Sequence, residues 1–401
     1  MTAAIHTSPN CGRLLGSEWE FDEVLHRLVL WLEERDYAGY EPYDLLNSKY
    51  LGGWARRQPF ATFFVQSGKR FGGEALRRAL RVPPSRNAKA LGLLLAAYCD
   101  LKHSGWNTGE QAAHVRRLLL ERRSPGEGEF CWGYDWHYVS LRGARLPAHS
   151  PNSVATVFCA DALLHHAETF YNIESRSAAL SAARWLCTSL RRSVDTPQHL
   201  CFSYTPDNRT KIFNNSVLIG AFLTRLDALE PLPEHRATSL RTMQFLVDHQ
   251  ADDGSWLYGL GRSQNWIDHF HTGYNLGALL DYQQLSGDCR FQHALMNGYE
   301  YYKRQFFTAE GVPKYFDTRT YPVDIHACSQ AILTFCAFRG LDPKALERAH
   351  SLARWTVAHF LNQDGSFGYQ MHRFHKDPTP YVRWSQAWML RALARLRREL
   401  A

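Results

Sequence analysis

Two short segments of the sequence place carboxylate and imidazole groups close together where a helix is expected to begin. They are WIDHFHTGYN (residues 266–275) and TYPVDIHACS (residues 320–329). A carboxylate beside an imidazole can orient the ring and stabilise its charged form, so such a pair suits general acid/base catalysis. The segments therefore predict proton-transfer chemistry, and their catalytic candidates are Asp268, His269, His271, Asp324 and His326.

Aromatic side chains accompany these groups and similar ones elsewhere in the chain. CWGYDW (residues 131–136) adds a sixth catalytic candidate, Asp135, and YVRWSQAWM (residues 381–389) adds Arg383, whose guanidinium can hold a carboxylate through two hydrogen bonds. Trp and Tyr rings pair a flat apolar face with a polar edge, which suits contact with sugar rings. The predicted substrate-binding residues are Tyr43, Asp44, Trp132, Tyr134, Trp136, Tyr204, Trp266, Tyr274, Tyr321, Arg383 and Trp384.

Short aromatic links recur along the chain. Their starts, at residues 131, 201, 253, 311 and 364, are 70, 52, 58 and 53 residues apart. A polar segment follows each link, and a stretch with apolar residues at helical spacing follows the polar segment. A period of this length is typical of αα-hairpins with a functional loop.

The repeat predicts an all-α protein with the architecture of an (α/α)6 toroid, in which inner and outer helices close into a ring. Residues 40–48 and a helix at 88–101 supply the sixth, degenerate unit. We expect residues 1–35 to form an N-terminal extension and first helix, and residues 36–401 to form a single toroid domain. The inner helices of such a ring begin at one rim, so the polar segments converge there beside free N–H groups. Other stretches with helical spacing are 21–34, 153–171, 216–230, 275–285 and 383–400.

Helix capping is an alternative role for the small polar residues that follow each link. Ser, Thr and Asn are favoured at the position before a helix because their side chains accept a hydrogen bond from the first turn. This role does not account for the Trp, Arg, Asp and His residues beside them. Acids that precede glycine, as in ADDGSW and QDGSF, are expected in tight turns. The capping candidates are Asn152, Ser153, Asn215, Ser216, Thr272 and Ser385.

The composition argues against several classes of partner and location. The chain has 401 residues, is 45% hydrophobic and carries a net charge of +7. Its basic residues are spread along helix faces, which argues against nucleic acid as a partner. Nine cysteines without a CxxC pair favour reduced thiols and a cytoplasmic location. We recognise no signal peptide and no apolar stretch that could span a membrane. The oligomeric state is left open.

Neither a metal nor a cofactor is predicted. His269 and His271 have a spacing that metal ligands can show, and so do His372 and His375, but no HExxH or Cys/His pattern supports a metal site. The phosphate-binding patterns GxxxxGK[ST] and GxGxxG are absent, which argues against a nucleotide site. Residues 372–375 are expected in a surface loop or lid.

Several motifs taken together resemble a bacterial family, the VpsJ-like polysaccharide biosynthesis proteins, found with exopolysaccharide and capsule biosynthesis genes. The resemblance is carried by YEPYDLLNS, RVPPSRNAKALGLLL, CFSYTPD, WIDHFHTGYNL, YPVDIHACSQAI and YVRWSQAWM, in this order and spacing. It runs from about residue 36 to residue 396. It implies an α/α-toroid of the six-hairpin glycosidase or terpenoid-cyclase type. Because the family has no agreed reaction, the resemblance assigns no role to a particular residue.

The preferred interpretation is an enzyme that acts on a sugar or a uronic-acid-containing oligosaccharide, as a hydrolase, a lyase or an epimerase. Hydrolysis requires two carboxyl groups about 5 to 10 Å apart across the scissile bond, for which Asp135, Asp268 and Asp324 are the candidates. Epimerisation or elimination instead uses His or Tyr to move the C5 proton while Arg383 neutralises a uronate. The saccharide is the one partner expected.

Two other classes of function remain open. The same aromatic cup would serve a non-catalytic glycan-binding or scaffold protein. A carbocation cyclase is the other alternative, because QADDGSW and QDGSF resemble the Gln/Trp repeats of squalene-type cyclases. The acid-rich DxDD motif of those enzymes is missing, which weighs against the cyclase.

Overall fold

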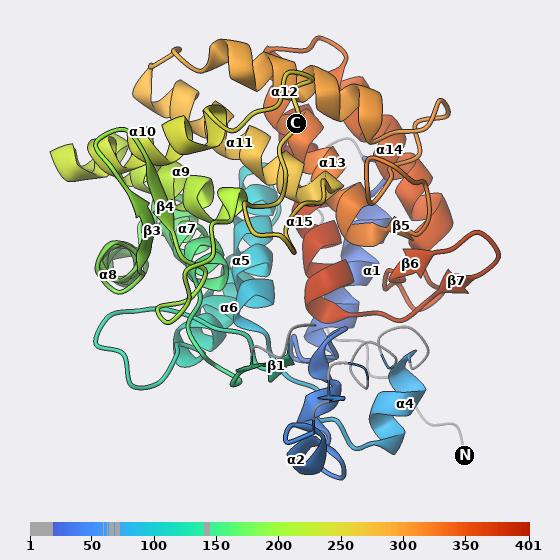
Figure 1. The fold of residues 1–401 in the computed structure, drawn as a ribbon. Coiled ribbons are helices and arrows are strands. Elements are labelled where there is room, and N and C mark those ends of the chain that lie inside the picture. The colour runs from blue at the N-terminus through green and yellow to red at the C-terminus, as the bar shows by residue number, and fades with distance from the viewer. Residues whose placement is uncertain (1–18, 59, 62, 64–67, 69–72, 140–144) are drawn as a thin grey trace, which may run out of the picture.

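The computed structural model describes residues 19–58, 60, 61, 63, 68, 73–139 and 145–401 and contains a closed ring of six inner helices (Figure 1). Each inner helix packs against the next one in the chain, and the last packs against the first. The prediction of an all-α (α/α)6 toroid is therefore confirmed. The inner helices are α5 (Ala88–His103), α7 (Ser153–Phe170), α9 (Phe213–Leu229), α11 (His269–Ser286), α13 (Ile325–Ala337) and α15 (Trp388–Leu400).

A second layer of helices surrounds this ring. Five outer helices each pack against the inner helix that precedes them in the chain. The first helix, α1 (Asp22–Glu33), packs against α15 instead, and Arg397 Nε lies 2.9 Å from Asp22 Oδ1 across this contact. The helix expected ahead of the domain therefore supplies the outer member of the sixth pair. The other outer helices are α6 (Gly109–Glu121), α8 (Ile173–Thr188), α10 (Pro233–Val247), α12 (Gln292–Gln305) and α14 (Ala345–Phe360).

The inner helices are buried because neighbours cover them on several sides. Every residue of α5 from Ala88 to Leu101 is buried, which its run of Leu and Ala permits. Small residues allow the inner helices to approach closely. A Cβ added at Gly92 of α5 would lie 3.2 Å from the Cα of Cys159 on α7, so a larger residue at this position would push the two helices apart.

Side-chain caps fix the starts of four inner helices. Asn87, Asn152, Asp268 and Asp324 precede α5, α7, α11 and α13, and each accepts a hydrogen bond from the first turn of its helix. Among the predicted caps Asn152 is therefore confirmed. The prediction was wrong for the others, because these residues lie within the first turns of their helices and not ahead of them. They are Ser153, Asn215, Ser216, Thr272 and, in the π-helical segment η3 (Val382–Ala387), Ser385.

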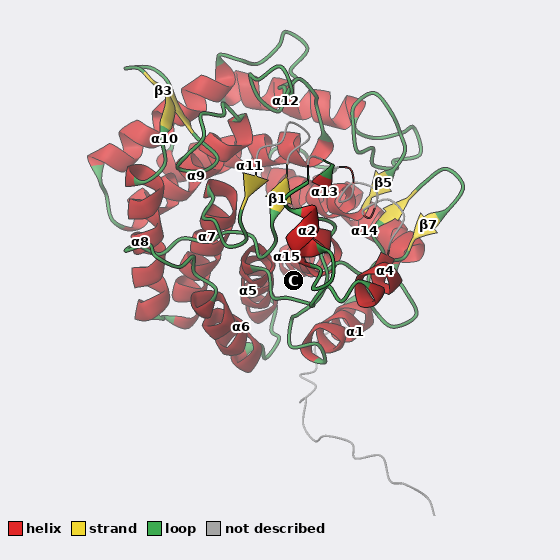
Figure 2. Cartoon of the chain, turned by 60° about the horizontal axis from the view of Figure 1, so that its bottom comes forward, coloured by secondary structure: helices red, strands yellow, loops and turns green. Residues whose placement is uncertain are grey.

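Short elements cover the rim where the inner helices begin. In Figure 2, which looks onto this end of the ring, α2 (Gly52–Ala55) and β1 (Tyr138–Val139) lie in front of the central helices, and α4 (Gly73–Ala79) lies to one side near α1. The turn η1 (Asp44–Asn47) precedes α2 in the chain, and β1 pairs with β2 (Arg145–Leu146). At the ring's periphery β3 (Arg192–Asp195) pairs with β4 (Leu200–Phe202), and β5 (Val323–Asp324), β6 (Gln370–Met371) and β7 (Lys376–Asp377) form a three-stranded sheet. A further turn, η2 (Phe338–Gly340), follows α13.

The Asp-Gly links form tight turns, as predicted. Asp253 and Asp364 each accept a hydrogen bond from the backbone N–H of the serine two residues later. The glycines between them, Gly254 and Gly365, have φ values of +94° and +89°, which favour glycine. These acids therefore shape the links and do not point to chemistry.

None of the helices in the described part of the chain combines the length and the apolar character that crossing a membrane requires.

Candidate active site

The caps and first turns of the inner helices bring residues from distant parts of the chain together at one rim. Stacked or edge-on ring contacts run from Tyr43 through Trp384 and His326 to Trp388. Phe270 of α11 stacks on His326 of α13 with 4.3 Å between the ring centroids. The two acid–imidazole segments of the sequence therefore meet in one cluster, which we call the rim cluster. Its members are Tyr43, Tyr134, Trp136, Asp268, Phe270, His271, Tyr274, Asp324, His326, Arg383, Trp384 and Trp388.

Asp268 and His271 form a dyad at the start of α11. The Nδ1 atom of His271 lies 2.6 Å from Asp268 Oδ2, and the backbone N–H of His271 donates to Asp268 Oδ1 at 3.0 Å. The indole N–H of Trp266 donates to the same carboxylate at 2.9 Å. Asp268 is buried and the His271 side chain is 21% exposed. The carboxylate therefore fixes the imidazole with its Nε2 atom, which makes no hydrogen bond to the described residues, directed away from Asp268.

His326 is held neutral beside this dyad. It lies between Phe270 and Trp388, and its Nε2 atom is 2.7 Å from the hydroxyl of Tyr274. Burial holds the pKa of His326 well below its usual range, and the nearby Arg383 adds to this effect. The Nδ1 atom is buried and has no hydrogen-bond partner among the described residues. Burial raises the pKa of Tyr274 well above its usual range, so the phenol keeps its proton.

Asp324 accepts hydrogen bonds from three elements. Its donors are the backbone N–H of His326 at 2.8 Å, the side-chain amide of Gln370 at 2.6 Å and the indole N–H of Trp384 at 2.9 Å. The carboxylate is fully buried. These bonds fix the start of α13 and the orientation of Trp384, so Asp324 suits a positioning role better than the transfer of a proton.

Arg383 lies inside an aromatic group at the rim. Its guanidinium carbon is 5.4, 4.9 and 5.0 Å from the ring centroids of Tyr134, Trp136 and Trp384. Tyr134 and Trp136 stack with 4.4 Å between their centroids. The hydroxyl of Tyr204 donates to that of Tyr134 at 3.4 Å, which joins this tyrosine to the group. Arg383 is thus positioned by three rings on its apolar faces.

The charge partner of Arg383 is Glu41, which the sequence did not single out. The Nε and Nη2 atoms of Arg383 lie 3.1 and 3.0 Å from Glu41 Oε2, and both side chains are buried. Burial raises the pKa of Glu41 to about 8, although Arg383 opposes this shift. Glu41 lies within YEPYDLLNS, a segment that the repeat analysis had assigned to the sixth unit. That position was the one feature of the sequence that could have indicated a role for Glu41 at the rim. Arg383 is less free to hold a substrate carboxylate than the sequence suggested.

Two other predicted acids support the rim. Asp135 accepts a hydrogen bond from Asn87 Nδ2 at 2.6 Å and one from the hydroxyl of Ser85. Asp44 pairs with Arg77, whose Nε atom lies 2.7 Å from Asp44 Oδ1 in a fully buried setting. Asp135 therefore binds the capping residue of α5, whereas the Asp44–Arg77 pair joins η1 to α4 among the elements that cover the rim.

His269, Trp132 and Tyr321 were predicted as site residues but lie outside the rim cluster. His269 points toward the outer layer, where its ring contacts Tyr302 and Phe306, and burial lowers its pKa to about 3. Trp132 is fully buried and its indole N–H donates to the carbonyl of Leu119 on α6, which makes it a core residue. Tyr321 is 42% exposed ahead of a cis proline. Adjacent positions on a helix point in different directions, so sequence proximity to Asp268 did not bring His269 into the cluster.

Lys89 is a second residue that the sequence did not single out. It lies in the first turn of α5 and is 3% exposed. Its Nζ atom lies 4.0 Å from the ring centroid of Phe158, 5.2 Å from that of Trp388 and 5.5 Å from that of Tyr274. A lysine inside the otherwise apolar run AKALGLLLAAYC was the signal that could have found it, because lysine is seldom fully buried.

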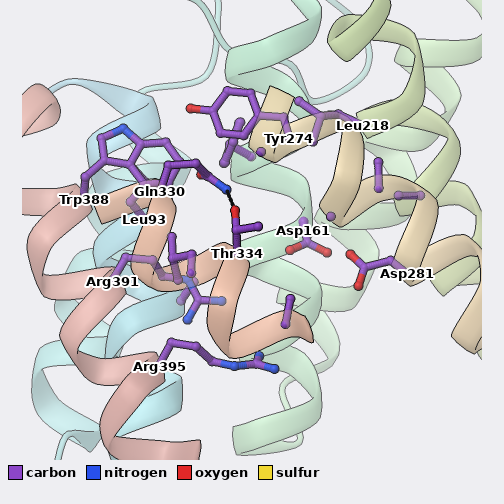
Figure 3. A pocket seen from close by; sticks show the side chains of 18 of the residues that line it. Leu93, Asp161, Leu218, Tyr274, Asp281, Gln330, Thr334, Trp388, Arg391 and Arg395 are labelled. Carbon is purple, nitrogen blue, oxygen red and sulfur yellow. Dashed lines mark hydrogen bonds between the residues drawn. The ribbon is translucent and has the colours of Figure 1, made fainter. Parts of the chain in front are cut away.

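A cavity of about 240 Å³ lies in the centre of the ring, beyond Tyr274 and Trp388 (Figure 3). Figure 3 shows Asp161 and Asp281 facing each other across it, with Arg391 and Arg395 further along α15. A second cavity of about 550 Å³ shares several of these walls and continues toward the ends of the inner helices. Tyr274 and Trp388 are therefore shared by the rim cluster and the wall of the first cavity, whose lining also includes these acids and arginines.

The described residues contain no group of three or more His, Cys, Asp and Glu side chains arranged to hold a metal ion. His372 and His375 stack on each other with 4.4 Å between their centroids, in the loop between β6 and β7.

The buried Glu41 predicts a specific dependence of stability on pH. Its folded pKa of about 8 exceeds the ordinary 4.5, so the folded state keeps a proton that the unfolded chain releases as the pH rises between these values. Glu41 therefore lowers the free energy of unfolding as the pH rises. Asp44, with a pKa raised to about 6 by burial, contributes in the same direction only below about pH 6.

We expect Glu41→Gln to lose less stability than the original protein between pH 6 and pH 8. Over this range the unfolding free energy of the variant, relative to that of the original protein, should rise by about 1 kcal/mol or more. Urea denaturation at both pH values measures this difference. An unchanged difference between pH 6 and pH 8 would show that Glu41 is already ionised at pH 6.

Comparison with known proteins identifies relatives of the fold. No family model matches the sequence, and no curated protein matches it. The cellobiose 2-epimerase of Bacillus thermoamylovorans is similar in structure, with a TM-score of 0.61 at 12% identity over 79% of this chain and 89% of its own. The cellobiose 2-epimerase of Spirochaeta thermophila has a TM-score of 0.61 at 15% identity, covering 78% and 86%. A family 76 α-mannanase of Bacteroides thetaiotaomicron has a TM-score of 0.58 at 10% identity, covering 78% and 87%.

The chain shares the (α/α)6 toroid of these enzymes. The six-hairpin part of the predicted resemblance is thereby confirmed at the level of the fold. At these identities the comparison carries no residue role across to this chain.

Proposed function

We propose that this chain is an enzyme that acts on a sugar by acid/base chemistry, and that its reaction is the epimerisation of a carbon next to a carbonyl group. The observation that supports this best is the Asp268–His271 dyad, in which a carboxylate fixes an imidazole at the rim. Imidazole is the side chain best suited to take and return a proton near neutral pH. The fold is also found in cellobiose 2-epimerases.

The rim cluster supplies the groups that such a reaction needs. His271 takes the proton from the carbon while Asp268 stabilises the resulting imidazolium. Tyr274, whose ring centroid lies 5.8 Å from that of His271, carries a protonated phenol that is hydrogen-bonded to neutral His326. This phenol can return a proton from another direction. The aromatic group around Arg383 offers flat faces for sugar rings.

Hydrolysis is the second candidate, since family 76 glycosidases share the fold. The raised pKa of Glu41 supports it, because a carboxylic acid that keeps its proton near neutral pH suits a general acid. Against it, Asp268, Asp324 and Asp135 are all engaged by nearby donors. Lyase chemistry would use the same His271 base.

The resemblance to VpsJ-like proteins supports a place in exopolysaccharide biosynthesis, in the cytoplasm of a bacterium, as the setting of this reaction. A uronic-acid-containing saccharide remains within this proposal, although the engagement of Arg383 by Glu41 leaves neutral reducing sugars equally suitable.

The experiment is a screen of purified protein against neutral reducing sugars, uronic-acid-terminated oligosaccharides and α-mannans. Products are separated by chromatography and identified by mass spectrometry and NMR. An epimer of unchanged mass supports the proposal. Shorter oligosaccharides support hydrolysis, a product containing a new double bond supports elimination, and binding without product supports the glycan-binding alternative.

A further inference from the structure

The Lys89 amine is enclosed without a charge partner. Among the described residues it makes no hydrogen bond or ion pair, and its three nearest recorded contacts are the rings of Phe158, Trp388 and Tyr274. Burying an ammonium group without a partner is unfavourable, and no carboxylate in the described part of the chain lies at contact distance to offset this. The other buried cations in the described parts of the chain, Arg77 and Arg383, each pair with an acid.

The surroundings favour the uncharged amine. Lys89 follows Ala88 in the first turn of α5, where the helix dipole is positive. Arg383 of η3 adds a nearby positive charge, while Glu41 and the Cys159 thiol are the neighbouring groups that oppose it. Burial has the largest effect and holds the pKa of Lys89 well below its usual range. A desolvated lysine next to another cation is a nucleophile near neutral pH.

The amine lies beside the proposed proton-transfer groups. Lys89 Nζ lies 5.5 Å from the ring centroid of Tyr274, and the centroid of the His271 ring lies 5.8 Å from it. Trp388, which contacts Lys89, also stacks on His326 with 4.4 Å between centroids. The amine and the proposed base are therefore both neighbours of Tyr274 in the rim cluster.

We propose that the Lys89 amine attacks the aldehyde carbon of an open-chain aldose and holds the sugar as an imine while His271 moves the proton. This inference rests on the proposed function and names its substrate class, a reducing sugar with a free aldehyde. The carbon–nitrogen bond forms as the carbonyl π bond breaks, and an amine proton passes to the oxygen. The hydroxyl then takes a proton and leaves as water, which gives a protonated imine.

The imine makes the neighbouring carbon more acidic. His271 removes that proton, the electron pair moves toward the positively charged nitrogen, and reprotonation on the opposite face gives the epimer. Addition of water to the imine then releases the sugar and restores the amine. No oxidant or reductant takes part, since each bond that forms is matched by one that breaks.

Reductive trapping tests this inference without requiring turnover. The intact protein is incubated at pH 7 with glycolaldehyde, a small hydroxyaldehyde, and sodium cyanoborohydride, and peptide mapping measures labelling at each lysine. Lys102 on the same helix is exposed and serves as the internal reference. We expect Lys89 to be labelled at least about tenfold faster, because an ordinary lysine is almost fully protonated at this pH. Labelling at Lys89 no faster than at Lys102 would overturn the inference.

Trapping with a substrate sugar separates this inference from the proposed function. We expect a sugar adduct on Lys89 that is absent in Lys89→Met, which keeps an apolar side chain against the three rings. Epimerisation without an adduct would contradict the imine and leave the His271 chemistry intact. If Lys89 is labelled rapidly by glycolaldehyde but no sugar is epimerised, the proposed epimerase function is contradicted and the reactivity of the Lys89 amine still stands. The thermal transition of Lys89→Met, expected at or above that of the original protein, shows whether the variant folds.

Discussion

Replacement of His271 by asparagine is expected to lower kcat for sugar epimerisation by about 10²- to 10⁴-fold, the range typical of losing a general base. The physical reason is that His271 is the imidazole whose orientation a buried carboxylate fixes, through the 2.6 Å contact between His271 Nδ1 and Asp268 Oδ2. Asparagine can still accept and donate hydrogen bonds but cannot take a proton. Steady-state kinetics with the sugar found in the screen measures the effect.

His269→Phe is the matched control, because it lies two residues away on the same helix. The His269 ring contacts Tyr302 and Phe306, and neither of its nitrogen atoms has a hydrogen-bond partner among the described residues. A phenyl ring fits this apolar setting, so kcat should stay within about twofold and the protein should not lose stability. If His269→Phe abolishes turnover while His271→Asn does not, the assignment of the base to His271 is wrong.

Replacement of Arg77 by methionine is expected to lower the free energy of unfolding by about 3–5 kcal/mol, because it leaves a buried carboxylate unpaired. Arg77 is fully buried and joins α4 to the segment that holds Glu41 and Asp44. Its Nε atom lies 2.7 Å from Asp44 Oδ1, and its Nη atoms donate to the backbone carbonyls of Gly73 and Glu41 at 2.9 and 2.8 Å. Urea denaturation measures the loss.

Arg78→Met provides the comparison for this variant. Arg78 is the next residue, its side chain is 70% exposed, and its contact with Glu74 is an (i, i+4) pair on the surface. Such pairs contribute little, so the unfolding free energy should change by less than about 0.5 kcal/mol. Equal losses in the two variants would show that the buried Arg77–Asp44 pair stabilises the fold no more than the exposed Arg78–Glu74 pair does.

The helices were the most predictable part of this fold. The predicted segments 88–101 and 153–171 correspond to Ala88–His103 and Ser153–Phe170, since apolar residues at three- and four-residue spacing mark a buried helix face. The start of the helix predicted at 275 was placed six residues too late. Its first turn holds His269 and His271, whose polarity concealed the periodicity, and Asp268 is its cap.

The residues that meet at the rim were only partly predictable from the sequence. The repeat indicated that Asp268, Asp324 and Arg383 lie on equivalent links, and the structure brings all three to the rim. The pairing of Glu41 with Arg383 joins residues 342 positions apart, and no local pattern indicates such a contact. Lys89 stands out as a lysine in an apolar run, but the rings that enclose it come from α7, α11 and α15, and that run does not indicate them.

The different roles of Asp268 and Asp324 could not be predicted from the sequence either. In the sequence Asp268 and Asp324 look alike, since each precedes a histidine and begins a helix. In the structure Asp268 contacts the imidazole side chain of His271, whereas Asp324 binds a backbone N–H, an amide and an indole. The side chains that face each carboxylate decide its role.

Solvent deuterium exchange tests the central claim, that the Asp268–His271 dyad moves a proton on a sugar carbon. The protein is incubated in D₂O with an unlabelled reducing sugar that the screen identifies, and NMR follows deuterium at the carbon next to the carbonyl. The account predicts incorporation at that carbon alone by the original protein, and incorporation lowered by about 10²-fold or more in His271→Asn. Conversion of the sugar without any deuterium at that carbon, or full incorporation by His271→Asn, would contradict it.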